Sequence, residues 1–256
     1  MSCVSSVSSV SSVSSVLFSV LLWPLFSVFL WSCAQPAAER QNAAVMRVLF
    51  IGNSLTATNG LPAMVQAVAA ASGDRLDCVA IAYPSLSLED HWSRGEALGA
   101  IKRGGWSFVV LQQGPSAMAD SRVLLREYVR RFDTEVRRSG ARTALYMVWP
   151  ESTRRGDFDA VSESYTIAAN DVDGVLLTAG DLWRAAWRRQ PELPLYGPDG
   201  FHPSPLGSYV AALAIYRGLT GRPPHVSESL QSSSGAFPAV KVTSDTVKML
   251  ESIVAR

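Results

Sequence analysis

The chain has 256 residues, of which 48% are hydrophobic and 18% are charged, so it suits one large α/β domain and is not disordered. Its 23 basic and 22 acidic side chains leave a net charge of +1, which argues against a nucleic-acid-binding protein. Three cysteines exclude a disulfide scaffold, and three histidines leave little room for a histidine-rich metal site. No Gly-rich phosphate loop and no clustered metal-ligand pattern appears in the sequence, and we expect neither a metal nor another cofactor.

The N-terminal segment carries no charge before Glu39, and a Ser/Val repeat in it precedes an apolar run at 16–31. This run is short for a membrane span but has the length of a signal-peptide core. Residues 1–34 are therefore interpreted as an export signal, either a signal peptide or a lipoprotein signal with Cys33 as the lipidated residue, and 35–45 as a short linker. The segment lacks the basic residues of an export signal, so an uncleaved anchor and a later start site stay open. The predicted location is periplasmic or extracellular, and this segment is the only expected membrane contact.

From residue 46 onward, short apolar runs alternate with helical patterns. Strands are predicted at 48–51, 79–82, 108–111, 144–148 and 175–177. Helices are predicted at 61–71, 122–139, 157–170, 181–189 and 205–219, with a further helix at 246–255. Strands that alternate with helices form right-handed crossovers, which predicts a five-stranded parallel sheet with helices on both faces. The domain is placed at 46–222, and 223–256 is expected to be a C-terminal loop and helix.

A possible nucleophilic centre follows from the residues at the carboxyl ends of the strands, where parallel sheets bind ligands. Ser54 follows the first strand in a tight turn, where a helix N-terminus can offer backbone N–H groups. A serine needs a base near neutral pH, and His202 is the obvious candidate. Asp199 lies three residues before His202, close enough to orient its ring and stabilise the imidazolium. Each residue alone is typical of a turn, a helix cap or a loop hydrogen bond, but together they indicate catalysis.

Two blocks carry a family resemblance: FIGNSLT near the start and DGFHPSPLGSYVAA near the end. They resemble the first and last blocks of the SGNH (GDSL-like) hydrolase superfamily, and the resemblance spans 46–220. It implies a flavodoxin-like, three-layer αβα sandwich and a Ser-His-Asp ester hydrolase. It carries over Ser54 as the nucleophile, His202 as the base and Asp199 as the partner of that base.

The two middle blocks depart from the family pattern, and they concern the oxyanion hole. The family has a glycine after the second strand whose N–H joins the hole. Here Ser85 or a neighbour takes that place, and the donor is kept unless the position needs a positive φ. The family's Gly-x-Asn block is replaced by 114–116, so Ser116 or the amide of Gln113 is the candidate further donor. The hole is thus assigned to Ser54, Ser85, Gln113 and Ser116.

The sequence therefore predicts an exported serine esterase that cleaves short-chain esters, with O-acetyl groups on carbohydrates as candidate substrates. Two alternatives stay open: a non-catalytic carbohydrate- or surface-binding module on the same fold, and an acyltransferase that uses the same triad. Three further polar residues are not assigned to the site: His91 is interpreted as structural, His225 as a surface residue and Asp181 as a helix N-cap. For Trp149 and Phe201, lining an acyl or sugar pocket and ordinary packing are equally favoured.

Overall fold

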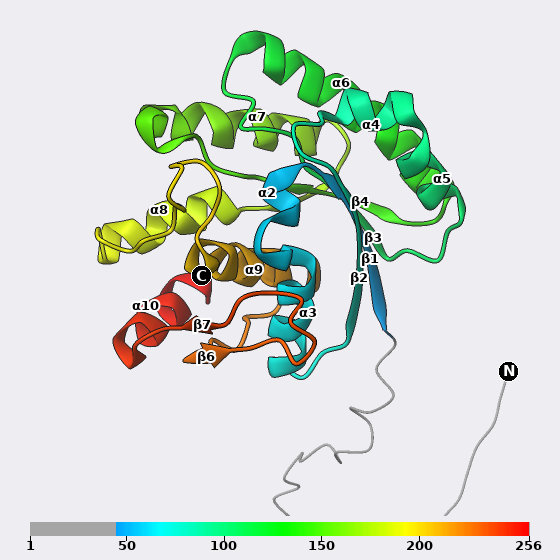
Figure 1. Cartoon of the computed structure of the whole chain (residues 1–256). Helices are drawn as coiled ribbons and strands as arrows, with labels where there is room; N and C mark the ends of the chain where they lie inside the picture. The colour runs from blue at the N-terminus through cyan, green and yellow to red at the C-terminus, as the bar shows by residue number, and fades with distance from the viewer. Residues whose placement is uncertain (1–44, 256) are drawn as a thin grey trace, which may run out of the picture. The chain divides into compact units, whose positions relative to one another are not determined.

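The computed structural model describes residues 45–255 and shows a parallel sheet between two layers of helices (Figure 1). The predicted export signal, Cys33 and nearly all of the predicted linker lie outside the described residues. The five strands have the spatial order β2-β1-β3-β4-β5, which confirms the predicted fold class. Their bounds are β1 Met46–Gly52, β2 Leu76–Ala82, β3 Phe108–Leu111, β4 Arg142–Tyr146 and β5 Val175–Leu177.

The centre of the sheet is apolar on both faces because helices cover both. Four consecutive residues of β1, Val48–Ile51, are at most 1% exposed, and all four residues of β3 are buried. Such runs without alternation are typical of parallel strands that are buried on both sides. The strand register pairs Gly52 with Ala82 and Ile51 with Leu111, so the chain leaves β1, β2 and β3 at one edge. The strand order reverses between β1 and β3, and open parallel sheets bind ligands at such a switch point.

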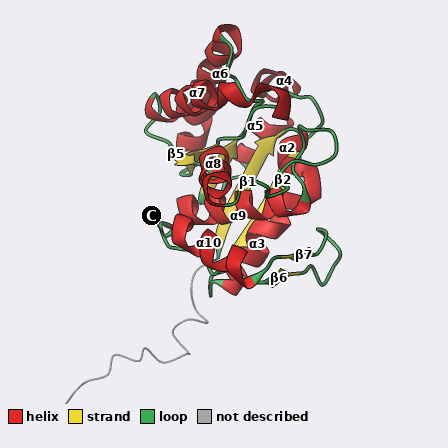
Figure 2. Cartoon of the chain, turned by 90° about the vertical axis from the view of Figure 1, so that its left-hand side faces the viewer, coloured by secondary structure: helices red, strands yellow, loops and turns green. Residues whose placement is uncertain are grey.

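The helices divide between the two faces of the sheet (Figure 1). One face is covered by α3 Leu61–Ala71, α9 Pro205–Thr220 and α10 Ser244–Val254, and the other by α4 Leu88–Arg94, α5 Glu96–Lys102, α6 Ala119–Arg138 and α7 Phe158–Asn170. The remaining long helix, α8 Ala179–Arg189, packs against both α7 and α9. Figure 2 shows the sheet between these layers from a second direction. None of the described helices is both long and apolar enough to cross a bilayer.

Several short elements were not expected from the sequence. They are the helices α2 Ser54–Ala57, α4 and α5, the 3₁₀ turns η1 Thr58–Gly60 and η2 Ser152–Asp157, and the pair β6 Ser229–Leu230 and β7 Val240–Lys241. Helix α4 has only two buried residues, so its apolar pattern is too short to indicate a helix. It begins with a capping box between Ser87 and Asp90. In the C-terminal segment, Leu250 and Val254 of α10 are buried, and this helix packs against α8 and α9.

Candidate active site

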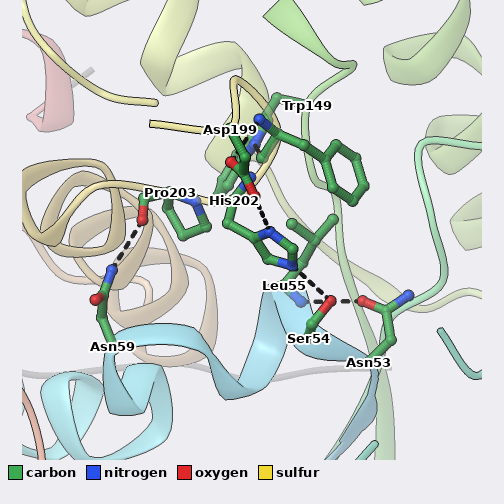
Figure 3. A network of polar contacts seen from close by, with 9 residues as sticks. Asn53, Ser54, Leu55, Asn59, Trp149, Asp199, His202 and Pro203 are labelled. Carbon is green, nitrogen blue, oxygen red and sulfur yellow. Dashed lines mark hydrogen bonds and ion pairs between the residues drawn. The ribbon is translucent and has the colours of Figure 1, made fainter. Parts of the chain in front are cut away.

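Ser54, His202 and Asp199 form one chain of hydrogen bonds at the carboxyl edge of the sheet (Figure 3). The distance from His202 Nε2 to Ser54 Oγ is 2.9 Å, and that from His202 Nδ1 to Asp199 Oδ2 is 2.5 Å. A carboxylate only accepts, so the proton on the ring lies at Nδ1, and Nε2 is left to accept the Ser54 proton. The structure thus brings together the three residues singled out in the sequence, although 148 positions separate the first from His202.

The loop before α9 holds the Asp199 carboxylate in place. Its second oxygen, Oδ1, accepts the backbone N–H groups of Phe201 at 3.0 Å and His202 at 2.9 Å. The bond from His202, and after it the bond from Phe201, lowers the pKa of the Asp199 carboxyl to about 2. This carboxylate is therefore ionised at every pH at which an esterase is normally assayed, and it stabilises a proton on the imidazole.

Removal of the imidazole is expected to raise the pKa of the Asp199 carboxyl from about 2 toward its ordinary value of 3.8, because that bond is the largest cause of the lowering. The folded-state pKa lies below the unfolded one, so the bond stabilises the fold above the ordinary pKa, and this stabilisation is lost as the pH falls through about 2. Carbon-13 NMR titration of the carboxyl in wild type and His202→Ala measures the shift. An identical midpoint in both proteins would contradict the hydrogen bond.

Ser54 lies in a turn that requires glycine at its first position, Gly52. A Cβ at Gly52 would lie 2.4 Å from both Gln112 Oε1 and Thr56 Oγ1, so a side chain does not fit there. Asn53 then caps α2 by accepting the N–H of Leu55 at its Oδ1, at 3.0 Å. Ser54 is the first residue of this helix, and its own N–H donates to no described residue. The turn therefore presents both the hydroxyl and a free backbone donor at one point.

Gln112 is not among the site residues predicted from the sequence, and it fixes this turn from the neighbouring strand. Its Oε1 accepts the N–H of Asn53 at 2.9 Å and the hydroxyl of Thr56 at 2.7 Å, and its side chain is 1% exposed. Its Nε2 donates to the carbonyl of Gln113 at 2.5 Å. Gln112 directly follows the buried strand β3 in a Gln-Gln pair. A polar residue at the carboxyl end of a buried strand is the feature of the sequence that indicates a place in the site.

His91 is structural, as expected. It is 1% exposed, and its Nε2 lies 2.7 Å from the carbonyl oxygen of Gly52. Burial lowers the pKa of its imidazole, so the ring is neutral near pH 7 and Nε2–H donates to that carbonyl. The ring therefore ties α4 to the end of β1, directly beneath the nucleophile turn. His225 is exposed, and its backbone N–H donates to Ser72 Oγ.

One other interpretation needs correction, and the two roles left open for Trp149 can be distinguished. Asp181 is not an N-cap, because α8 begins at Ala179, two residues earlier than expected, and Asp181 lies in its first turn. Trp149 lines no substrate pocket, because it is fully buried and stacks on Trp183 with 3.6 Å between ring centroids. Its indole Nε1 instead donates to the carbonyl of Phe201 at 3.0 Å, which supports the loop that carries the histidine.

Ser85 has a left-handed backbone conformation, with φ of +62°. The position therefore has the positive φ under which the replacement of glycine was expected to remove the donor. A non-glycine residue pays roughly 1 kcal/mol for this conformation. Ser85 nevertheless adopts it, is exposed, and donates its N–H to no described residue. The backbone donor is therefore kept, although glycine would fit the position better.

Gln113 and Ser116 use their donors on other protein groups. The amide of Gln113 donates to Ser116 Oγ and to the carbonyl of Ser121, each at 3.3 Å. The Ser116 hydroxyl donates to the carbonyl of Gly114 at 3.1 Å. Both side chains could join an oxyanion hole only by giving up these hydrogen bonds. The two bonds from Gln113 are long for N–H···O contacts.

Two cavities flank the hydrogen-bonded chain. The first has a volume of about 450 Å³ and is lined by polar and apolar residues that include Gln113, Ser116, Met118, Leu124, Arg154 and Phe201. The second, of about 580 Å³, is lined by the histidine loop and the turn after α2, including Asn59, Tyr196, Asp199 and His202. Phe201 thus lines a cavity whereas Trp149 does not. No cluster of three or more potential metal ligands occurs within residues 45–255.

Comparison with solved structures gives the same fold, whereas no family model and no functionally curated protein matches the sequence. A protein from Slackia heliotrinireducens assigned as an SGNH hydrolase is 28% identical, with a TM-score of 0.58 over 69% of this chain and 100% of that one. A DUF4886 family protein from Bacteroides uniformis has a TM-score of 0.66 at 18% identity, over 83% and 94%. An acetylxylan esterase from Geobacillus stearothermophilus has 0.53 at 16% identity, over 68% and 94%. The last two show a shared fold only.

Proposed function

The chain belongs to the SGNH hydrolase superfamily, and from that premise we propose that it is an exported serine esterase that uses Ser54, His202 and Asp199 as its catalytic triad. The observation that carries the proposal is the unbroken chain from the Ser54 hydroxyl through the imidazole to the Asp199 carboxylate. It lies at the switch point of the sheet, next to two open cavities. Export rests on the uncharged, apolar N-terminal segment alone.

The reaction follows from where the protons lie. His202 Nε2 takes the proton of Ser54 as the hydroxyl oxygen attacks the ester carbonyl carbon. The imidazolium that forms is stabilised by Asp199 and returns the proton to the leaving alcohol, which leaves an acyl group on Ser54. Water, activated by the same imidazole, then attacks the acyl carbon and releases the acid.

Negative charge on the carbonyl oxygen needs donors aimed at it, and two free backbone N–H groups are available. One belongs to Ser54 at the start of α2 and the other to Ser85 after β2. The register between β1 and β2 brings the ends of these strands side by side. We assign the oxyanion hole to these two groups, with Gln113 joining them only if its amide leaves Ser116 or Ser121.

Ser85→Gly is expected to keep kcat/KM within about threefold, because only the side chain is removed and the proposed donor is the backbone N–H. It is also expected to raise the free energy of unfolding by roughly 0.5–1 kcal/mol, because glycine adopts a positive φ without the steric cost. Urea denaturation and p-nitrophenyl acetate kinetics measure the two effects. A loss of 100-fold in kcat/KM would show instead that the hydroxyl is the donor.

The proposed substrates are short-chain esters, with O-acetyl groups on carbohydrates as the first class to test. The cavity of about 450 Å³ beside Phe201 is open and mixes apolar side chains with serines, an arginine and two carboxylates, which suits a polar alcohol half as well as a short acyl chain. One protein of the same fold is an acetylxylan esterase. This supports the choice of acetylated polysaccharide as a substrate to test.

Turnover of p-nitrophenyl acetate, butyrate and octanoate, together with acetate release from acetylated xylan, tests the proposal. Hydrolysis of the acetyl ester is expected, with rates that fall as the acyl chain lengthens. Binding to the polysaccharide without turnover of any ester would favour the non-catalytic module. Transfer of the acyl group to an added acceptor alcohol, in preference to water, would favour the acyltransferase.

A further inference from the structure

Three consecutive backbone carbonyls around His202 are each held by a different part of the protein. Trp149, which follows β4, donates its indole N–H to the carbonyl of Phe201 at 3.0 Å. The N–H of Gly197, within the same loop, donates to the carbonyl of His202 at 2.7 Å. The side chain of Asn59 donates to the carbonyl of Pro203 at 2.9 Å (Figure 3). Of the three donors, only Asn59 lies in the segment that carries Ser54.

Asn59 has a backbone conformation that its residue type suits. It lies in the turn between α2 and α3 with φ of +55°, followed by Gly60 with φ of +60°. Asparagine is one of the few non-glycine residues that enter this left-handed region readily. The turn directs the Asn59 amide toward α9, where the same Nδ2 also lies 3.0 Å from Ser208 Oγ as a donor. Both hydrogen bonds of the Asn59 side chain therefore connect the segment that carries Ser54 to the segment that begins just after His202.

We propose that Asn59 is a positioning residue that sets the distance between the Ser54 hydroxyl and the His202 imidazole. Asn59 lies five residues after Ser54, and its partner Pro203 directly follows His202. Packing of α3 against α9 brings the two segments together, but apolar contacts are tolerant of small shifts. The hydrogen bond from the Asn59 amide is directional, so it fixes the separation of the two segments close to the atoms between which the proton is transferred. This inference rests on the proposed function, because it concerns the geometry of the same triad.

The test compares wild type with Asn59→Gly, which keeps a residue suited to a positive φ and removes only the amide. We expect kcat for p-nitrophenyl acetate to fall by about 10- to 100-fold with KM unchanged within twofold, since a misplacement near the reacting groups costs rate rather than binding. The rate constant for fluorophosphonate labelling of Ser54 is expected to fall by the same factor. Values of kcat and labelling rate within twofold of wild type would overturn the proposal. Should this variant not fold, Asn59→Asp, whose carboxylate cannot donate to Pro203, is measured in its place.

Two further variants separate positioning from stability. Tyr216→Phe removes the hydroxyl bond between α9 and Asp74, another side-chain link between α9 and the region after α3, but at a distance from the triad. It is expected to lower the melting temperature while kcat stays at the wild-type value. Ser208→Ala removes one of the two hydrogen-bond partners of Asn59, so we expect kcat to fall two- to fivefold. We expect no further fall in kcat when Ser208→Ala is added to Asn59→Gly. A loss of kcat in Tyr216→Phe as large as that in Asn59→Gly would reduce Asn59 to a general stabilising role.

Ser54→Ala in the same assay distinguishes failure of this inference from failure of the proposed function. If Ser54→Ala is inactive and Asn59→Gly has wild-type kcat, only the positioning role is wrong. If Ser54→Ala turns over the ester as wild type does, the triad itself is wrong and the positioning role fails with it. If both variants lose activity as stated and Tyr216→Phe does not, the positioning role is supported.

Discussion

Replacement of Ser54 by alanine is expected to lower kcat/KM for p-nitrophenyl acetate by about 10⁴- to 10⁶-fold, because no acyl-enzyme can form without the hydroxyl. The reason is structural as well as chemical: Ser54 Oγ is the atom that faces His202 Nε2, at 2.9 Å. Any residual hydrolysis would come from water activated by the imidazole, together with the backbone donors of the turn. Steady-state kinetics at pH 8 with purified protein measures the loss.

The fold should tolerate this change. The Ser54 hydroxyl bonds only to His202 among the described residues, and α2 is capped by Asn53, so the free energy of unfolding is expected to change by less than about 1 kcal/mol. Ser139→Ala is a matched control, because Ser139 lies at the end of α6 and its hydroxyl bonds only to the carbonyl of Val136. Esterase activity in Ser54→Ala within tenfold of that control would mean that another group is the nucleophile.

Asp199→Asn is expected to lower kcat by about 10³- to 10⁴-fold while the loop keeps its shape. An asparagine Oδ1 can still accept the N–H groups of Phe201 and His202. Its NH₂ group, however, can donate to His202 Nδ1, which moves the ring proton to Nε2. The imidazole then offers a proton to Ser54 where it should accept one.

Proton NMR measures this change of tautomer together with the kinetics. In wild type the proton between His202 Nδ1 and Asp199 Oδ2, across 2.5 Å, is expected to give a low-field signal that is absent from Asp199→Asn. Asp199→Ala serves for comparison, because it removes the loop bonds as well and should lower the melting temperature further. If Asp199→Asn retains wild-type kcat, the carboxylate does not set the tautomer, and the role given to it is wrong.

The features that could be predicted from the sequence are those encoded over short stretches. The buried strand at 108–111 shows as four apolar residues in a row, and the helix at 61–71 is found with the expected bounds. Asp199 and His202 are three positions apart, so their contact is largely a property of one loop. Ser54 was identifiable because the carboxyl ends of parallel strands gather at one edge of the sheet.

The features that were missed depend on partners far away in the chain. Gln112 contacts the nucleophile turn across 59 positions, Trp149 reaches the histidine loop across 52, and Asn59 reaches it across 144. The sequence marks Gln112 only as a polar residue after a buried strand and Trp149 only as an aromatic residue near the sheet edge. It does not show what Gln112, Trp149 or Asn59 contacts, because these contacts arise only when the segments meet. The short helices α2 and α4 were missed for the related reason that few residues of each are buried.

Backbone conformation was the other quantity that the sequence did not provide. Ser85 and Ser116 both have a positive φ, of +62° and +56°, although serine has no strong preference for that region. The sequence shows only that a glycine of the family pattern is replaced at the first position. That the replacement leaves the N–H free follows from the folded structure.

Covalent labelling with a fluorophosphonate, followed by mass spectrometry of the digested protein, tests the central claim most directly. We predict one phosphonyl group per molecule, on the peptide that contains Ser54, with no labelling in Ser54→Ala and slow labelling in His202→Ala. Stoichiometric modification of any other residue, or no reaction in a protein that hydrolyses esters, would contradict the assignment of Ser54 as the nucleophile.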